Sequence, residues 1–198
     1  MSGIIYGYRG NFYLNITNRC PCDCTFCYRY IHDSIGDSDS LWLDGEPTAD
    51  EVMDAIRSAG VGPKDNLVFC GFGEPTERMD VVTEVSRRVR EGIGCRIRLD
   101  TNGLGCLVNG RDILPELSEC IDAVSISLNA PDAETYGRLT RCSFDPGEAY
   151  AELLDFIRRS RDTFSDVTVS VVGMSLTDKQ ISMCQTIADQ MGVRFRVR

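Results

Sequence analysis

The sequence predicts an α/β fold, because strand-like and helix-like segments alternate from residue 12 to the end of the chain. Apolar and β-branched runs favour strands at residues 12–17, 66–71, 95–100, 122–128, 167–173 and 193–197. Amphipathic patterns favour helices at residues 48–59, 76–91, 112–119, 132–140, 147–162 and 178–191. Such alternation is typical of parallel sheets, so we expect a partial (β/α)6 TIM-like barrel.

A hairpin can precede this series. Residues 3–8 suit an extra N-terminal strand that turns at Gly10 and Asn11. Residues 12–17 then alternate between apolar and polar side chains, as a strand with two different faces does. This first barrel strand leads directly into a loop rich in cysteine.

The helices are predicted from their ends and from their apolar faces. Helix 48–59 opens with a capping box of Thr48 and Glu51, and Gly60 stops it. Two of the longer helices carry an apolar stripe at helical spacing, formed by Met79, Val82, Val85 and Val89 in one and by Tyr150, Leu153, Leu154 and Ile157 in the other. We therefore expect each helix to bury one face against the sheet.

Polar and glycine-rich segments follow the ends of the predicted strands. They are the cysteine loop, Gly71-Phe-Gly-Glu-Pro, Asp100-Thr-Asn-Gly, Ser127-Leu-Asn and Val172-Gly173. Parallel sheets carry their chemistry at the carboxyl ends of the strands. Five such segments therefore indicate a functional site at that edge.

Length and composition suit one globular domain over residues 1–198. The hydrophobic fraction is 42% and the charged fraction is 26%. The net charge of −9 argues against a body that grips nucleic acid by neutralising phosphates. No apolar run reaches the length of a membrane helix and the first residues lack a signal-peptide pattern, so we expect no membrane contact and a cytoplasmic location. The ten cysteines are then expected to be reduced.

Cys20, Cys24 and Cys27 form the most informative motif of the chain, C-x3-C-x2-C. Three thiolates on a tight loop can hold three irons of a cubane cluster and leave the fourth iron without a protein ligand. Most protein iron–sulfur clusters are closed by four cysteines. A site that is one ligand short can bind another molecule there, as open catalytic metal sites do.

Cys22 supplies a fourth thiol and hence an alternative. A zinc site saturated by four cysteines would make the chain a zinc-stabilised βα binding module without redox chemistry. Zinc ribbons pair two separated C-x2-C units, and the sequence holds no second unit. The spacing therefore favours the iron cluster, with Cys22 as a bystander.

The motifs resemble those of the radical S-adenosylmethionine (radical SAM) superfamily. The cysteine motif includes the aromatic Phe26 before its last cysteine, and Phe69-Cys-Gly-Phe-Gly-Glu-Pro-Thr is similar to the Gly-Gly-Glu motif after the second strand, with Phe72 in place of a glycine. The segments Leu14-Asn-Ile-Thr-Asn-Arg-Cys, Asp100-Thr-Asn-Gly and Ser125-Ile-Ser-Leu-Asn-Ala-Pro-Asp look closest to the TatD-associated radical SAM proteins.

The resemblance implies a role for each matching position. Cys20, Cys24 and Cys27 would ligate a 4Fe-4S cluster, and the amino and carboxylate groups of S-adenosylmethionine (SAM) would chelate the fourth iron. Gly71 and Gly73 would let the backbone approach SAM, and Glu74 would lie near its amino group. The remaining contacts would come from Thr101 and Asn102 to the methionine carboxylate, Ser127 and Asn129 to the ribose, and Phe26, Val172 and Gly173 near the adenine.

The same resemblance implies the reaction class. One electron, from a donor such as flavodoxin or ferredoxin, would split the sulfur–C5′ bond of SAM and give a 5′-deoxyadenosyl radical that abstracts hydrogen from a substrate. The substrate stays open between a protein glycine, a nucleoside or RNA, and a small metabolite. A core of this size leaves room for a macromolecular substrate.

The sequence does not show whether the side chains of two sets of arginines point into the barrel or toward solvent. Arg96 and Arg98 alternate along one strand, and Arg194, Arg196 and Arg198 alternate along another. Pointing inward, they could hold an anionic substrate through paired hydrogen bonds; pointing outward, they would only be solvated. Cys142 could lie near the substrate, although buried thiols are common.

Overall fold

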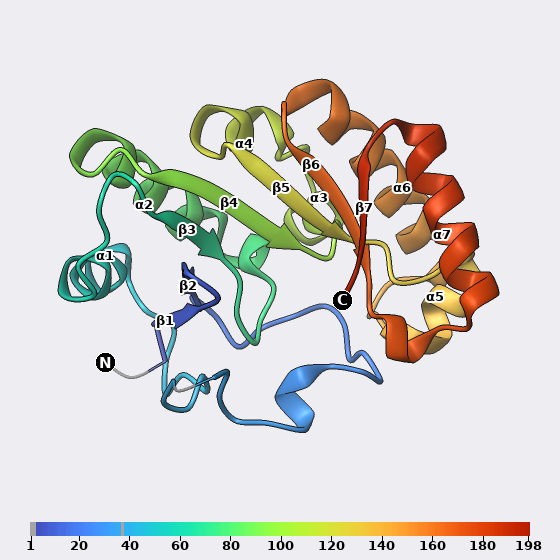
Figure 1. The fold of residues 1–198 in the computed structure, drawn as a ribbon, viewed down its shortest axis with the longest axis horizontal. Coiled ribbons are helices and arrows are strands. Elements are labelled where there is room, and N and C mark those ends of the chain that lie inside the picture. The colour runs from blue at the N-terminus through green and yellow to red at the C-terminus, as the bar shows by residue number, and fades with distance from the viewer. Residues whose placement is uncertain (1–2, 37) are drawn as a thin grey trace. The chain divides into compact units, whose positions relative to one another are not determined.

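The computed structural model describes residues 3–36 and 38–198, which form two compact units. The first unit contains the described residues up to Cys20, together with Tyr28–Asp100 and Glu116–Asp122. The second contains Pro21–Cys27, Thr101–Pro115 and Ala123–Arg198. Both units combine helices with parallel strands, so the predicted α/β class is confirmed (Figure 1). The assignment of residues 1–198 to a single domain stays a prediction.

The first unit is a four-stranded sheet with helices. Its strands are β1 Ile5–Tyr8, β2 Asn11–Leu14, β3 Asn66–Phe69 and β4 Arg96–Thr101. Its helical elements are η1 Tyr28–Tyr30, α1 Ala49–Ser58, η2 Pro75–Arg78, α2 Met79–Gly92 and most of α4 Leu114–Cys120. Strand β1 pairs antiparallel with β2, whereas β2, β3 and β4 pair in parallel.

The expected N-terminal hairpin is present, with its turn one residue earlier than predicted. Tyr8 pairs with Asn11, so the two-residue turn is Arg9-Gly10. Both turn residues have positive φ angles, 47° and 76°. This conformation is the one that matches the twist of the flanking strands, and it comes easily to glycine but rarely to arginine.

Helix α1 begins as the sequence predicts. The Thr48 side chain accepts a hydrogen bond from the Glu51 N–H, and the Glu51 side chain accepts one from the Thr48 N–H, which completes the capping box. The predicted helix over residues 76–91 begins differently. Glu74 caps a 3-10 turn with Pro75 at its first position, and the α-helix starts only at Met79.

The sheet of the first unit has two different faces. Side chains alternate along each strand, and residues paired in parallel register share a face. One face is apolar, with Leu14, Leu67, Phe69, Ile97 and Leu99 fully buried and Phe12 half-buried. The opposite face combines the buried Val68 with polar and aromatic side chains, namely Tyr6, Tyr13, Arg98 and Asp100. Parallel sheets usually bury apolar side chains on both faces, so the polar face is available for chemistry.

The second unit is a parallel sheet with helices packed on it. Its strands are β5 Ala123–Ser127, β6 Val167–Val171 and β7 Arg194–Val197. Its helical elements are α3 Gly105–Asn109, α5 Ala133–Thr140, α6 Pro146–Thr163, η3 Gly173–Ser175 and α7 Asp178–Met191. Figure 1 shows α7 beside β6 and β7, with α6 next to α7 and β6.

The strands of the second unit also have an apolar and a polar face. Val124, Ile126, Val169 and Val171 are buried on one side. The parallel register places hydroxyl and guanidinium side chains on the other, namely Ser125, Ser127, Thr168, Ser170, Arg194 and Arg196. The strands of both units therefore carry a polar face.

Helix α3 was not predicted. It is only five residues long, lies between Gly103 and Gly110, and ends at Gly110 in the left-handed conformation. So short a helix has no repeating apolar pattern to detect.

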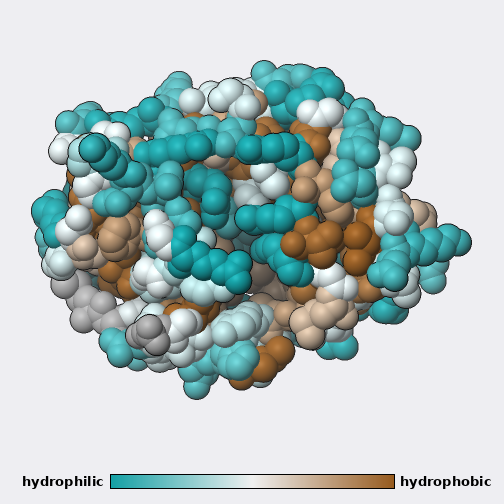
Figure 2. Space-filling view, viewed as in Figure 1, coloured by the Kyte–Doolittle hydropathy of each residue, from teal (hydrophilic) through white to brown (hydrophobic). Residues whose placement is uncertain are grey.

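The visible face in Figure 2 is mainly hydrophilic with small separate apolar patches, and within the described residues no helix is long and apolar enough to cross a bilayer.

Candidate cofactor site

The Gly71–Glu74 segment of the first unit is built around Asn15. Asn15 is buried, and its Nδ2 donates to the Gly3 carbonyl at 2.9 Å and to the Leu41 carbonyl at 2.6 Å. Its Oδ1 accepts from the Phe72 N–H at 3.1 Å. A Cβ atom on Gly71 would stand 2.0 Å from that Oδ1. Gly71 is therefore required by the packing of Asn15, a reason that the sequence did not reveal.

Gly73 lies against the chain that leads into Cys20. A Cβ atom at this position would stand 2.3 Å from the Thr17 carbonyl oxygen and 2.5 Å from that of Arg19. The next residue, Glu74, donates its N–H to the Arg19 carbonyl at 2.8 Å. Gly73 therefore allows a close backbone approach, and the atoms approached in the structure are backbone carbonyls of the protein.

Glu74 is buried, and its carboxylate stabilises the local turn. Oε1 accepts from the Thr76 N–H at 3.2 Å and from the Thr76 hydroxyl at 2.8 Å. Buried carboxylates are costly unless they are hydrogen-bonded, and these bonds lower that cost. The side chain is held in one position, as a binding residue must be.

A second carboxylate fastens the chain just before Cys20. Glu46 accepts from the Thr17 hydroxyl at 2.5 Å and from the Arg19 guanidinium at 2.7 and 3.1 Å. Arg78 pairs with the same carboxylate at 3.2 Å. Burial raises the pKa of Glu46, but the hydrogen bonds and these two arginines outweigh burial and leave the pKa below its ordinary value.

The rest of the cysteine loop belongs to the second unit and is held by the end of α5. The Asp23 N–H donates to the Thr140 carbonyl at 3.0 Å, and the Thr25 N–H donates to the Leu139 carbonyl at 2.9 Å. The Ser143 N–H donates back to the Pro21 carbonyl at 2.8 Å. This contact brings the Cys142 segment beside the loop, while a place of Cys142 near the substrate stays one of two open alternatives.

The four cysteines of the loop differ in their surroundings. Cys20, Cys24 and Cys27 are partly exposed, whereas Cys22 is buried and accepts a hydrogen bond from Asn102 Nδ2 at 3.8 Å. All ten cysteines of the chain are thiols rather than disulfides. Among residues 3–36 and 38–198, no three Cys, His, Asp or Glu side chains are gathered in a metal-binding arrangement. The assignment of the three cluster ligands therefore remains a prediction.

Thr101 and Asn102 shape the turn after β4. Thr101 Oγ1 accepts from the Gly103 N–H at 3.1 Å, and Asn102 Oδ1 accepts from the Leu104 N–H at 2.9 Å. Gly103 has a φ of 79°, and a Cβ atom there would stand 2.5 Å from Leu153. The turn brings Asn102 to Cys22, so one of the predicted SAM contacts lies beside the cysteine loop.

Ser127, Asn129 and Gly173 lie at the carboxyl ends of β5 and β6. Ser127 Oγ accepts from Arg198 Nη2 at 2.9 Å, and the Gly173 N–H donates to the Arg198 carbonyl at 3.0 Å. Asn129 is buried in a left-handed conformation, with a φ of 57°. Its Oδ1 has no hydrogen-bond partner among the described residues. Such an atom needs a partner, and a bound ligand or water can supply it.

Val172 and Phe26, the other expected adenine neighbours, are half-buried in the same unit. Val172 precedes η3, and its carbonyl accepts from the Ser175 hydroxyl at 2.7 Å.

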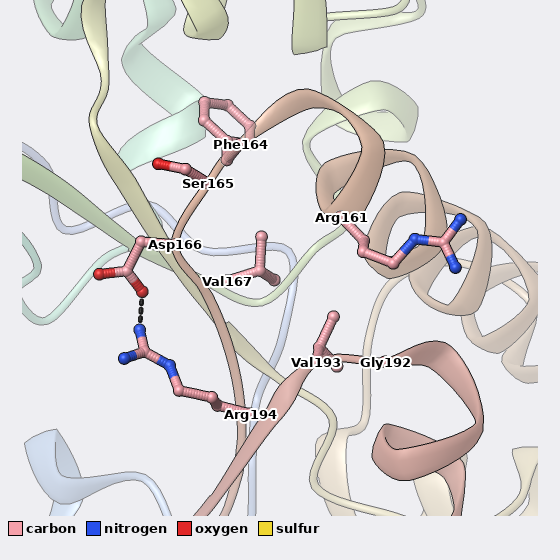
Figure 3. A pocket seen from close by; sticks show the side chains of 8 residues that line it. All are labelled: Arg161, Phe164, Ser165, Asp166, Val167, Gly192, Val193 and Arg194. Atoms are coloured by element: carbon pink, nitrogen blue, oxygen red, sulfur yellow. Dashed lines mark ion pairs between the residues drawn. The ribbon is translucent and has the colours of Figure 1, made fainter.

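A cavity of about 370 Å³ lies at the opposite end of the strands, where β6 and β7 begin (Figure 3). That cavity lies away from the carboxyl ends and does not include any predicted cofactor-binding residue.

Comparison with known proteins identifies a family. The profile described as the Radical SAM superfamily matches residues 14–185. The chain is 33% identical over 135 residues to a GTP 3′,8-cyclase of Corynebacterium glutamicum, covering 65% of this chain and 33% of that protein. It is 29% identical over 150 residues to a 7-carboxy-7-deazaguanine synthase of Caulobacter vibrioides, covering 71% and 62%. The chain thus spans less than two thirds of the length of either curated relative.

Solved structures support the fold. The structure of Streptococcus suis SuiB bound to its precursor peptide SuiA matches with a TM-score of 0.63 and 15% identity, covering 92% of this chain and 37% of SuiB. TYW1 with a lysine-pyruvate adduct matches with a TM-score of 0.63 and 16% identity, covering 96% and 65%. At these identities the likeness establishes the fold alone.

Proposed function

Because the chain belongs to the radical SAM superfamily, we propose that it abstracts a hydrogen atom from its substrate after reductive cleavage of SAM. Members of this superfamily are enzymes that use a 4Fe-4S cluster and SAM. When bound, the two cofactors supply a 5′-deoxyadenosyl radical. The protein supplies the ligands, the orientation of SAM and the exclusion of water.

The cluster ligands in this proposal are Cys20, Cys24 and Cys27. The observation that carries the assignment is the environment of Cys22, which is buried and bonded to Asn102 while the other three thiols are partly exposed. A zinc site made of four cysteines needs all four thiolates around one ion. Cys22 would have to leave its buried position to join such a site, and this supports three ligands with an open position.

The SAM contacts in this proposal follow the strand ends. The Glu74 carboxylate is held by the Thr76 hydroxyl. Gly71 and Gly73 have no Cβ atom, so the backbone at these two positions can pack closely against its neighbours. Asn129 fits a ribose contact best, because its buried Oδ1 can accept a hydrogen bond from a ribose hydroxyl. The other contacts are assigned to Thr101, Asn102, Ser127, Phe26, Val172 and Gly173.

For the substrate and the partners we propose classes of molecule only. Within the superfamily, the motifs favour the TatD-associated proteins as the nearest group. The two curated relatives carry names of small-molecule enzymes, whereas SuiB binds a peptide. We therefore keep protein, RNA and small metabolites as substrate classes, with flavodoxin or ferredoxin as the electron donor and the cytoplasm as the location.

Anaerobic reconstitution with iron and sulfide tests the cofactor assignment. The wild-type protein should be brown and hold about four irons and four sulfides per chain. It should cleave SAM to methionine and 5′-deoxyadenosine when dithionite is added. Cys24→Ala should lose both properties, and Cys22→Ala is the matched control from the same loop, which should keep them.

The opposite pattern would refute the proposal. Colourless protein with one tightly bound zinc ion, lost equally in Cys22→Ala and Cys24→Ala, would identify a binding module instead. SAM cleavage by Cys24→Ala at the wild-type rate would remove the cluster assignment. Addition of candidate proteins, RNAs or metabolites to the active enzyme then ranks the substrate classes by their effect on 5′-deoxyadenosine formation.

A further inference from the structure

The polar face of β5, β6 and β7 carries a row of hydroxyl and guanidinium groups near the strand ends. Parallel register pairs Ser127 with Ser170, and Ser170 with Arg196, across three neighbouring strands. Side chains in such a row point to the same face, and neighbouring strands lie about 4.8 Å apart, so the row spans about 10 Å. Arg198, just beyond β7, joins the row through its hydrogen bond to Ser127 Oγ at 2.9 Å.

The arginines of the two polar faces differ in how their charge is compensated. Arg194, at the start of β7, forms an ion pair with Asp166, and Figure 3 shows the two side chains pointing toward each other. In the first unit, Arg98 donates to both carboxylate oxygens of Asp100, from Nε to Oδ1 at 2.7 Å and from Nη2 to Oδ2 at 3.2 Å. Arg196, by contrast, has no ion pair among the described residues. Of these three arginines, only Arg196 therefore keeps an uncompensated charge.

Ser170 Oγ, in the middle of the row, is a buried polar atom without a hydrogen-bond partner within the described residues. Buried hydroxyl groups are normally satisfied, so the Ser170 hydroxyl can donate to an oxygen of a bound group. Asn129, whose N–H approaches the Ser170 carbonyl at 3.4 Å, is the neighbour assigned above to the ribose.

We propose that Arg196, Arg198 and Ser170 bind an anionic oxygen group, a phosphate or a carboxylate, of the substrate. Guanidinium groups offer paired donors to such oxygens, and the serine hydroxyl adds a third donor. Ser127, which the proposed function places at SAM, also positions Arg198 by accepting its hydrogen bond at Oγ. The paired register of β5, β6 and β7 brings no acidic side chain into this row of described residues. The substrate role rests on the proposed function, whereas anion binding itself does not.

Net charge makes this site testable. The chain carries −9 overall, so a free anion is repelled unless a local site attracts it. Isothermal titration of the reconstituted protein with inorganic triphosphate, and separately with citrate, measures the site directly. Binding of triphosphate alone would identify a phosphate-bearing substrate, and binding of citrate alone a carboxylate-bearing one. Either result, or binding of both, supports the proposal.

The variants separate a built site from general attraction. Arg196→Gln and Arg198→Gln should each raise the Kd about tenfold or more, since hydrogen bonds to charged groups are worth about that factor. Arg194→Gln is the matched control from the same strand and face, and its Kd should stay within about twofold of wild type because Asp166 already neutralises that arginine. Ser170→Ala should weaken binding without lowering the melting temperature, because it removes an unsatisfied buried hydroxyl.

Three results would overturn the proposal. The first is that neither triphosphate nor citrate binds. The second is that Arg194→Gln and Arg196→Gln raise the Kd equally. The third is that the Kd stays at the wild-type value both in Ser170→Ala and in Arg196→Gln. SAM cleavage by dithionite is measured on the same samples without any substrate. Intact SAM cleavage with failed anion binding would remove the anion site alone, while lost SAM cleavage with intact anion binding would remove the proposed reaction alone.

Discussion

Asn102 Nδ2 donates a hydrogen bond to Cys22 Sγ at 3.8 Å, which ties the turn after β4 to the cysteine loop. The contact gives the fourth cysteine of the loop a packing role. The other three thiols are partly exposed. From this contact we expect Cys20, Cys24 and Cys27 to be the ligands and Cys22 to be a structural residue.

Cys22→Ala should therefore lower stability without removing iron. The change deletes a buried sulfur and its contact with Asn102, which should reduce the free energy of unfolding by about 1–2 kcal/mol. Chemical denaturation of the metal-free protein measures this loss, and iron analysis after reconstitution should give the wild-type value. A drop in bound iron equal to that of Cys27→Ala would contradict the structural role.

Gly71→Ala should be strongly destabilising. Its new Cβ would stand 2.0 Å from Asn15 Oδ1, so Asn15 would have to abandon three hydrogen bonds or the backbone would have to move. We expect a loss of about 2–4 kcal/mol in the free energy of unfolding. Gly92→Ala is the control, because no atom lies within 4 Å of its added Cβ, and it should change stability by less than about 1 kcal/mol. Equal effects of the two changes would show that the Asn15 contact is unimportant.

Asn15→Asp tests the same centre by charge rather than by size. The new carboxylate would place an oxygen against the carbonyls of Gly3 and Leu41, which now accept from the amide nitrogen. Leaving these buried groups unsatisfied should cost at least about 3 kcal/mol in thermal or urea unfolding near neutral pH. Asn11→Asp on the partly exposed hairpin is the matched control. A difference of less than about 1 kcal/mol between the two variants would refute the role given to Asn15.

Glu46→Gln should make stability less dependent on pH in the acid range. The pKa of Glu46 is below its ordinary value of 4.5 in the folded protein, so its contribution is complete above about pH 4.5 and is lost as the pH falls through the folded pKa. The gap in unfolding free energy between wild type and Glu46→Gln should therefore be constant near neutral pH and shrink in acid. Asp39→Asn, at an exposed acid outside any ion pair of the described residues, is the matched control for replacing an acid by its amide. A gap that widens in acid would reverse the assigned sign.

The sequence predicts the repeating elements well and the long-range contacts poorly. The α7 boundaries at residues 178–191 and the Thr48 capping box follow from local patterns, so they are confirmed. Helix α3 was missed because five residues between glycines carry no period. The Asn15 contacts with Leu41 and Phe72 join residues that are 26 and 57 positions apart, and no local pattern encodes them.

The arginines show the same limit. Their alternation places Arg96 and Arg98, or Arg194 and Arg196, on one face, but only the paired register identifies which face that is. The sequence also cannot show that Asp100 neutralises Arg98 while Arg196 stays without an ion pair in the described structure. The site residues themselves remain predictions that the experiments above decide.

The tight fit of Gly73 beneath the Thr17 and Arg19 carbonyls has a practical consequence for protein engineering. The chain entering the cysteine loop and the Gly-Phe-Gly-Glu segment form one mechanical piece. A designer who transplants the loop to another scaffold would have to carry the second segment with it, because Gly73 and Glu74 fit directly against the Thr17 and Arg19 backbone.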